Sequence, residues 1–160
     1  MANRHLIRTA LVCVSLLSLS GCGIGFNAGT NTQKPSGNGA FQNVGDLEIR
    51  NATIVANPND PSSGTLIVSI YNNGEKADAL TNVSSNSFES QSSSALSIGS
   101  NQILSVGLSP ETTISLASMT LALVPGTYVN ATFSFENAPS ATLPILVNAN
   151  TGIYKDIKLP

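Results

Sequence analysis

The amino-acid sequence predicts an all-β fold, a β-sandwich of Greek-key type, preceded by a signal peptide and a flexible tether. Three observations predict it. From Gly45 onward, apolar residues recur at every second position in several short runs, as in half-buried strands. Clusters of Gly, Pro, Asn and Ser separate these runs, and no run has a convincing helical period. Roughly 115 residues from Gly45 to the end is the usual size of one such domain.

The first predicted strand is followed by a loop rich in turn residues. In "DLEIRNATIV", Leu47 and Ile49 alternate with charged residues, before Ile54 and Val55. "NPNDPSSG", residues 57–64, contains only residues typical of turns, so we predict a loop there.

The segment "TLIVSIYNNG" predicts a strand with two distinct faces. One face carries Leu66, Val68 and Ile70, and the other carries Ile67, Ser69 and Tyr71. The following Asn72-Asn73-Gly74 tolerates positive φ, so the strand should turn there.

The middle of the chain predicts short strands at residues 80–84 and 95–98, with a serine-rich connection between them. Further on, the apolar positions change parity: Ile114 and Leu116 are even-numbered, whereas Met119, Leu121 and Leu123 are odd-numbered. A straight strand would switch faces there, so we expect a bulge or a tight turn near Ala117 and Ser118.

The clearest alternation in the chain is "TYVNATFSFE". One face carries Val129, Ala131, Phe133 and Phe135. After the turn "NAPSA", the residues Leu143, Ile145 and Val147 repeat the pattern, which predicts two neighbouring strands.

The N-terminal residues have the pattern of an export signal. A positively charged start precedes the apolar run "TALVCVSLLSLS" at residues 9–20, which is shorter than the about 20 residues that cross a bilayer. Leu19-Ser20-Gly21-Cys22 follows and resembles the lipobox of bacterial lipoproteins, in which small residues precede the acylated cysteine. We therefore predict a lipoprotein signal peptide at residues 1–21, cleavage between Gly21 and Cys22, and lipidation of Cys22.

An ordinary small buried cysteine is the alternative for Cys22. The charged start, the apolar run and the lipobox agree, so we favour acylation. Several acyl chains anchor a protein stably, which predicts a lipid anchor in the cell membrane with the domain on the extracytoplasmic side. Residues 22–44 then form the acylated Cys and a tether rich in Gly, Asn, Ser and Thr, and residues 45–160 form the folded domain.

The remaining side chains argue against catalysis. Cleavage removes His5, the single histidine, and Cys13, so no histidine base is left for a nucleophilic triad and no second thiol for a disulfide. We therefore expect no enzyme. Scarce basic and aromatic residues argue against nucleic acid as a partner. Asp60, Glu75 and Asp78 match no calcium loop, and we interpret them as solvated loop charges.

The order of several motifs resembles the PCuAC-type periplasmic copper chaperone family, and more narrowly its actinobacterial LpqE-like lipoprotein branch. These motifs are "VGDLEIRNATIV", "GTLIVSIYNNGEKADALTNVSS" and "GTYVNATFSFENA" with "LPILV", and they cover residues 44–147. The most specific is "IYNNGEKADALTNVSS". The resemblance implies a cupredoxin-like or immunoglobulin-like sandwich outside the cytoplasmic membrane, in which His and Met side chains hold Cu(I).

The copper ligands that this resemblance implies are missing from the sequence. The first ligand region reads "FESQSS" (residues 88–93), the later one reads "ASMTLAL" (residues 117–123), and neither contains His. Met119 is the one weak metal candidate. As a ligand it would be a lone thioether, whereas as a core residue it fits the odd-numbered row with Leu121 and Leu123. We favour the core role and expect no cofactor.

Two functions from different classes remain. The first is a non-catalytic binding or accessory module on a lipid anchor, with an unidentified envelope protein as its partner and the copper site lost. The alternative is a metallochaperone that delivers Cu(I) to an extracytoplasmic enzyme. Since a fold alone does not transfer function, the missing ligands favour the first.

Overall fold

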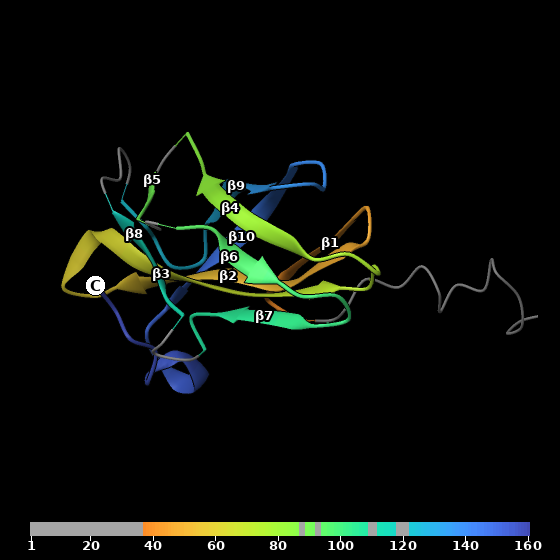
Figure 1. Cartoon of the computed structure of the whole chain (residues 1–160). Helices are drawn as coiled ribbons and strands as arrows, with labels where there is room; N and C mark the ends of the chain where they lie inside the picture. The colour runs from red at the N-terminus through yellow and green to blue at the C-terminus, as the bar shows by residue number, and fades with distance from the viewer. Residues whose placement is uncertain (1–36, 87–88, 92–93, 109–111, 118–121) are drawn as a thin grey trace, which may run out of the picture. The chain divides into compact units, whose positions relative to one another are not determined.

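The computed structural model describes residues 37–86, 89–91, 94–108, 112–117 and 122–160 (Figure 1). Within these residues the strands form one 10-stranded sheet. The strands are β1 (Ala40–Val44), β2 (Leu47–Asn57), β3 (Asp60–Asn72), β4 (Asp78–Ser84), β5 (Glu89–Gln91), β6 (Leu96–Ile98), β7 (Ile103–Val106), β8 (Ile114–Ala117), β9 (Tyr128–Phe135) and β10 (Ala141–Ala149). A short 3-10 helix, η2 (Gly152–Tyr154), follows β10. Across the described ranges, we find no helix with the length and apolarity that a membrane crossing requires.

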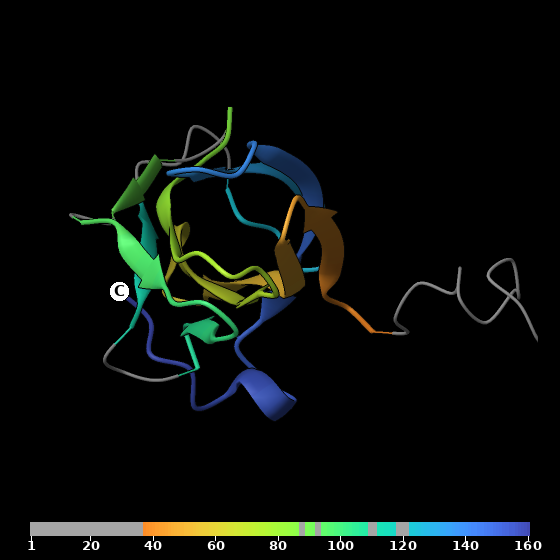
Figure 2. The same cartoon turned by 45° about the vertical axis from the view of Figure 1, so that its right-hand side comes forward.

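The sheet wraps around a common core and closes on itself (Figure 2). From β2 the order runs through β10, β9, β4, β5, β8 and β3, and β3 pairs with β2 again. The β2–β10 pair is parallel and joins Thr53–Ala56 to Leu146–Ala149. The other recorded pairs are antiparallel. The predicted all-β class is confirmed, and the sheet is mixed and nearly barrel-shaped.

The alternating residues point into this core as predicted. On β3, Leu66, Val68 and Ile70 are fully buried, whereas Ser69 and Tyr71 on the other face are half-buried. The inward residues of β9 and β10 are buried in the same cluster: Ala131, Phe133, Phe135, Leu143, Ile145 and Val147. Burial of apolar surface therefore selects the inward face of β9 and β10. Part of β3 is buried on both faces, since Ile67, opposite to Leu66 and Val68, is 4% exposed.

The predicted turn at Asn72-Asn73-Gly74 is confirmed, and the side chain of Asn72 holds it. Asn72 is 1% exposed; its Oδ1 accepts a hydrogen bond from the Gly74 N–H at 2.9 Å. Its Nδ2 donates to the carbonyl oxygens of Lys76 (2.8 Å) and Ile98 (3.1 Å). A buried amide thereby links the end of β3 to the end of β6.

Two expected boundaries are wrong. Strand β1 lies within residues 22–44, assigned to the tether, because Ala40–Val44 pair with β2 and Val44 is buried. The predicted loop 57–64 is also too long. Strand β2 continues to Asn57 and β3 begins at Asp60, so residues 60–64 are sheet; Asn57 Oδ1 accepts the Asn59 N–H at 3.0 Å and supports a tight turn.

Candidate functional site

The predicted site residues Gly21, Cys22 and Met119 lie outside the residues that the structure describes. The change of parity near Ala117 and Ser118 also falls at the edge of this range, since β8 ends at Ala117 and the description resumes at Ala122. Leu123, the one described residue of the odd-numbered row, is 3% exposed and belongs to the core.

The structure brings together the two regions where the family resemblance places copper ligands. Strand β5, from the first region, pairs with β8, which leads into the second. The paired residues are Glu89 with Ala117, Ser90 with Leu116 and Gln91 with Ser115. The described residues hold no group of three or more His, Cys, Asp or Glu side chains that could bind a metal ion.

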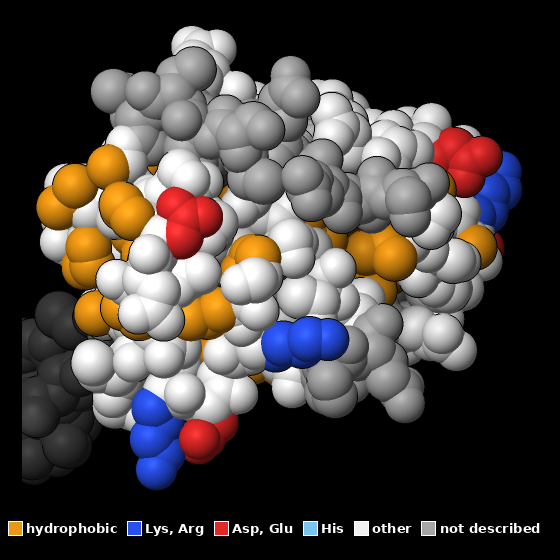
Figure 3. Space-filling model, turned by 90° about the vertical axis from the view of Figure 1, so that its left-hand side faces the viewer, with side chains coloured by type: hydrophobic (Ala, Val, Ile, Leu, Met, Phe, Trp, Pro, Cys, Tyr) orange, Lys and Arg blue, Asp and Glu red, His pale blue; other side chains and the backbone are white. Residues whose placement is uncertain are grey.

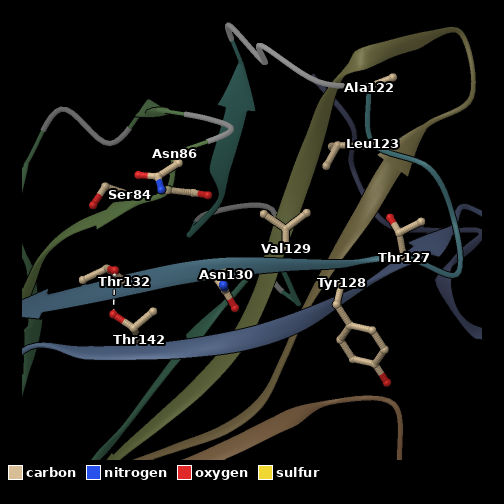
Figure 4. A pocket seen from close by; sticks show the side chains of 11 residues that line it. Ser84, Asn86, Ala122, Leu123, Thr127, Tyr128, Val129, Asn130, Thr132 and Thr142 are labelled. Carbon is tan, nitrogen blue, oxygen red and sulfur yellow. Dashed lines mark hydrogen bonds between the residues drawn. The ribbon is translucent and has the colours of Figure 1, made fainter.

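A cavity of about 560 Å³ lies beside this pair of strands, next to the end of β4 (Figure 4). Its volume is within the range of about 300–1,000 Å³ typical of ligand clefts. The described lining residues are Ser84, Ser85, Asn86, Ala122, Leu123, Thr127, Tyr128, Val129, Asn130, Thr132 and Thr142. Hydroxyl and amide groups dominate, Leu123 and Val129 add apolar surface, and every described lining residue is uncharged.

Main-chain contacts position one wall of the cavity. The Leu123 N–H donates to the Pro61 carbonyl oxygen at 2.8 Å, which fixes the segment after β8 against the start of β3. A Cβ on Gly64 would lie 2.8 Å from Leu123 Cδ1, so glycine lets this side chain approach the strand. On the other wall, the hydroxyls of Thr132 and Thr142 join β9 to β10 at 2.8 Å (Figure 4).

The surface has little charge to attract an ionic ligand. On the face in Figure 3, the charged side chains are few and lie among many uncharged ones, and at two places a red and a blue side chain touch. The cavity therefore suits a neutral polar ligand with some apolar surface, because burying an unpaired charge there would be costly. Its rim includes Tyr128, which is 67% exposed.

Asp78 is not a solvated loop charge, and that expectation is wrong. It is 8% exposed at the start of β4. Its Oδ1 accepts the N–H groups of Ala79 (2.7 Å) and Asn137 (3.0 Å), and its Oδ2 accepts that of Ala138 (2.9 Å). Burial raises the pKa of this carboxyl, but the backbone N–H groups outweigh burial and hold the pKa below its usual value.

The other two carboxylates match the expectation of exposure. Asp60 and Glu75 are exposed. The hydroxyl and the backbone N–H of Ser62 both bond Asp60 and lower its pKa. A second cavity, of about 370 Å³, has Asp46, Lys76 and Asp78 in its lining. The Asp78 oxygens in this lining already accept backbone hydrogen bonds, so this carboxylate stabilises the fold, and we assign it no ligand.

Comparison with solved structures decides the fold. The copper-bound PCuAC domain from PmoF2 superposes with a TM-score of 0.61 at 20% identity, over 69% of this chain and 98% of that chain. The apo PCuAC domain from PmoF1 gives 0.62 at 19% identity, over 69% and 99%. This chain has the fold of a PCuAC domain. The expected cupredoxin-like architecture is thereby confirmed. No protein-family model and no curated protein matches the chain in sequence.

Sequence reasoning did not find the cavity of this PCuAC-like domain. Its lining comes from residues 84–86, 122–123, 127–130, 132 and 142, and most of its members are common Ser, Thr and Asn residues. The one local signal was the polar face of "TYVNATFSFE", which carries Tyr128, Asn130 and Thr132. That face is typical of any solvent-facing strand, so it could not single out a site.

Proposed function

We propose that this chain is a membrane-anchored extracytoplasmic lipoprotein whose PCuAC-like domain is a non-catalytic binding module for an envelope protein. We propose further that it has lost the copper site of its fold. The main support is the β5–β8 pairing, which brings together both regions where the resemblance implies copper ligands. The cavity beside them is lined mainly by hydroxyl and amide groups and has no charged residue in its described lining. After Cys22 the sequence has no His, no further Cys and a single Met.

Ligand chemistry supports the loss of copper. Cu(I) selects soft thioether and thiolate sulfur together with imidazole. Ser, Thr and Asn oxygens are hard ligands, and a lone thioether at Met119 cannot supply the several soft donors that selective binding requires. The same inventory supports a non-catalytic role, because the segment after Cys22 lacks a histidine base.

A competition titration tests the copper part of the proposal. The full chain is titrated with Cu(I) against a chromophoric chelator, together with Met119→Ala and the size-matched Met119→Leu. We expect affinity no tighter than about micromolar and equal curves for the three proteins. Tighter binding that both substitutions abolish would overturn the loss of copper.

The anchor is tested separately in cells of a bacterial host. The unmodified chain should incorporate labelled fatty acid and fractionate with membranes, whereas Cys22→Ser should do neither. Cys13→Ser is the matched control, because the predicted cleavage removes it. Membrane fractionation of Cys22→Ser, with no label on the unmodified chain, would contradict the lipoprotein assignment.

The alternative function is a copper metallochaperone for an extracytoplasmic enzyme. Its support is the similarity in fold to the copper-bound PCuAC domain from PmoF2. The titration distinguishes the two functions, because a chaperone must bind Cu(I) selectively and the binding module need not.

A further inference from the structure

Strand β9 has one paired edge and one edge that faces the cavity. On one side β10 pairs along Tyr128–Phe133. On the other side β4 pairs with β9 from Phe135 only as far as Thr132, where Ser84 is its last partner. Beyond that point β4 leaves β9, and the cavity occupies the space between them (Figure 4).

The lining of the cavity identifies it as an edge site. Four consecutive residues, Thr127–Asn130, line it. Successive side chains of a strand point to opposite faces of a sheet. Because side chains from both faces of β9 line the cavity, it lies along the edge of the strand, where the main-chain N–H and C=O groups are.

The register shows which main-chain groups point into the cavity. Pro144 lies opposite Asn130 and has no N–H, so the two cannot exchange hydrogen bonds and form a non-hydrogen-bonded pair. The main-chain groups of Asn130 therefore point away from β10, and those of Tyr128, two residues earlier, point the same way. The main-chain groups of the odd-numbered residues point toward β10 instead. The carbonyl of Thr127, next to Tyr128, accepts the Val147 N–H at 2.9 Å.

The N–H and C=O groups of Tyr128 and Asn130 thus face the cavity. Among the described residues, β4 supplies no strand partner to either of them. An unpaired strand edge is a ready template for another strand. Recognition by strand addition takes its affinity from such main-chain groups and its specificity from the side chains around them.

We propose that the edge of β9 at Tyr128–Asn130 binds an extended, uncharged peptide segment of a partner protein. The segment adds a strand antiparallel to β9, in the place that a longer β4 would occupy. This rests on the proposed binding function and names the class of its partner. The uncharged lining excludes charged side chains from the segment, because their desolvation would have no compensation.

The shape of the site favours a single extended segment over a second copy of this chain. Residues 84–86 and 122–123 line the same cavity as the β9 edge and lie on one side of β9, apart from each other along the strand (Figure 4). The space of about 560 Å³ along this edge, with residues 84–86 and 122–123 at its two ends, is small and suits one extended segment. The edge of a folded sheet brings neighbouring strands with it, and these would meet residues 84–86 or 122–123.

The test uses the full chain and a capped hexapeptide of alternating Thr and Val. Amide hydrogen exchange is followed by NMR at single residues. Peptide binding should slow exchange at Tyr128 and Asn130 by about tenfold or more, and should leave Val129 and Ala131 unchanged because these already bond to β10. A peptide N-methylated at alternate residues, and one with Lys in place of Thr, should produce neither effect.

Two substitutions at Asn130 distinguish the contribution of its main-chain N–H to peptide binding from that of its side chain. Asn130→Pro removes the N–H that faces the cavity and should weaken binding about threefold to tenfold, as expected for one hydrogen bond. Asn130→Ala keeps the N–H and should bind within about twofold of the unmodified chain. The N-methylated peptide serves as the main-chain test if Asn130→Pro does not fold.

Three results would overturn the proposal. They are binding that survives N-methylation, protection that appears elsewhere on the domain, and protection that depends on protein concentration with a dimer in sedimentation. The last would assign the edge to self-association. None of them affects the copper titration, so a failure of this proposal and a failure of the proposed function give different data.

Discussion

Asp78 joins the start of β4 to the turn between β9 and β10, and its removal should destabilise the domain. The side chain accepts three backbone N–H groups at 2.7–3.0 Å. Asp78→Ala leaves all three without this acceptor. Asp78→Asn can keep one oxygen in the Oδ1 position, but it then directs an NH2 group at the Ala138 N–H.

The number and type of these hydrogen bonds determine the expected loss in the free energy of unfolding. A hydrogen bond to a charged group contributes about 1.5–3 kcal/mol to stability, and neighbouring bonds do not add in full. The Asn137 and Ala138 N–H groups are part-buried and regain some water when the carboxylate is lost. We therefore expect Asp78→Ala to lower the free energy of unfolding by about 2–4 kcal/mol, and Asp78→Asn by about half as much.

The free energy of unfolding of the unmodified chain and of both variants is measured by urea unfolding, followed by circular dichroism, at several pH values. The folded-state pKa of Asp78 is lowered, so its ionised form stabilises the domain fully above the unfolded pKa of about 3.9. That contribution is lost as the pH falls from about 4 through the folded-state pKa. The difference between the unmodified chain and Asp78→Ala should therefore shrink below about pH 4.

The control for this experiment is Asp60→Ala. Its carboxylate is exposed and contacts only its own turn, so the urea midpoint at neutral pH should stay close to that of the unmodified chain. A loss below about 0.5 kcal/mol for Asp78→Ala at pH 7 would refute the structural role. A difference that persists unchanged at pH 2–3 would refute the assignment to the ionised carboxylate.

Three further substitutions test the core and its turns, each by urea unfolding. Phe133→Ala removes a fully buried ring and should cost about 3–5 kcal/mol, with Phe133→Leu costing less; equal costs would argue against tight packing there. Gly107→Ala places a Cβ 2.3 Å from the Leu66 carbonyl oxygen at a φ of +76°, and should cost about 2 kcal/mol or more; a stabilised variant would contradict this geometry. Asn72→Ala leaves the Lys76 and Ile98 carbonyls without their donor and should cost about 2–3 kcal/mol, whereas exposed Asn73→Ala should have little effect.

Strong alternation made much of the fold predictable. Strands β3, β9 and β10 each carry three or more inward apolar residues at period two, and the structure buries them as predicted. Burial decides the conformation of such segments, so the local pattern is enough. The turn at Asn72 was predictable for the same reason, since its residues favour a turn in any context.

Short strands depend on partners that are distant in sequence. Strand β7 (Ile103–Val106) pairs with β3, and its first residue is 63% exposed, so it has little pattern of its own. Strand β5 has three residues inside a serine-rich segment. These strands are fixed by hydrogen bonds to neighbours, and only the three-dimensional arrangement reveals them.

The site was predictable only in part. The family resemblance singled out two regions of the chain, residues 88–93 and 117–123, and the structure pairs β5 from the first with β8, which leads into the second. The buried carboxylate of Asp78 was missed, because an Asp before a strand is commonly solvated and its three donors come from residues 79, 137 and 138. The β9 edge was missed because it depends on where β4 stops, which no local pattern encodes.

The parallel pairing of β2 with β10 places a constraint on how the chain reaches its native state. Thr53 donates its hydroxyl to the Leu146 carbonyl, 93 residues away along the chain. Such distant contacts slow folding, because the loop between them must close first. A chain that is synthesised from its N-terminus leaves Thr53–Ala56 of β2 without their β10 partners until residues 146–149 have been made. During that interval this part of β2, which includes the buried Ile54 and Val55, is open to pairing with other chains.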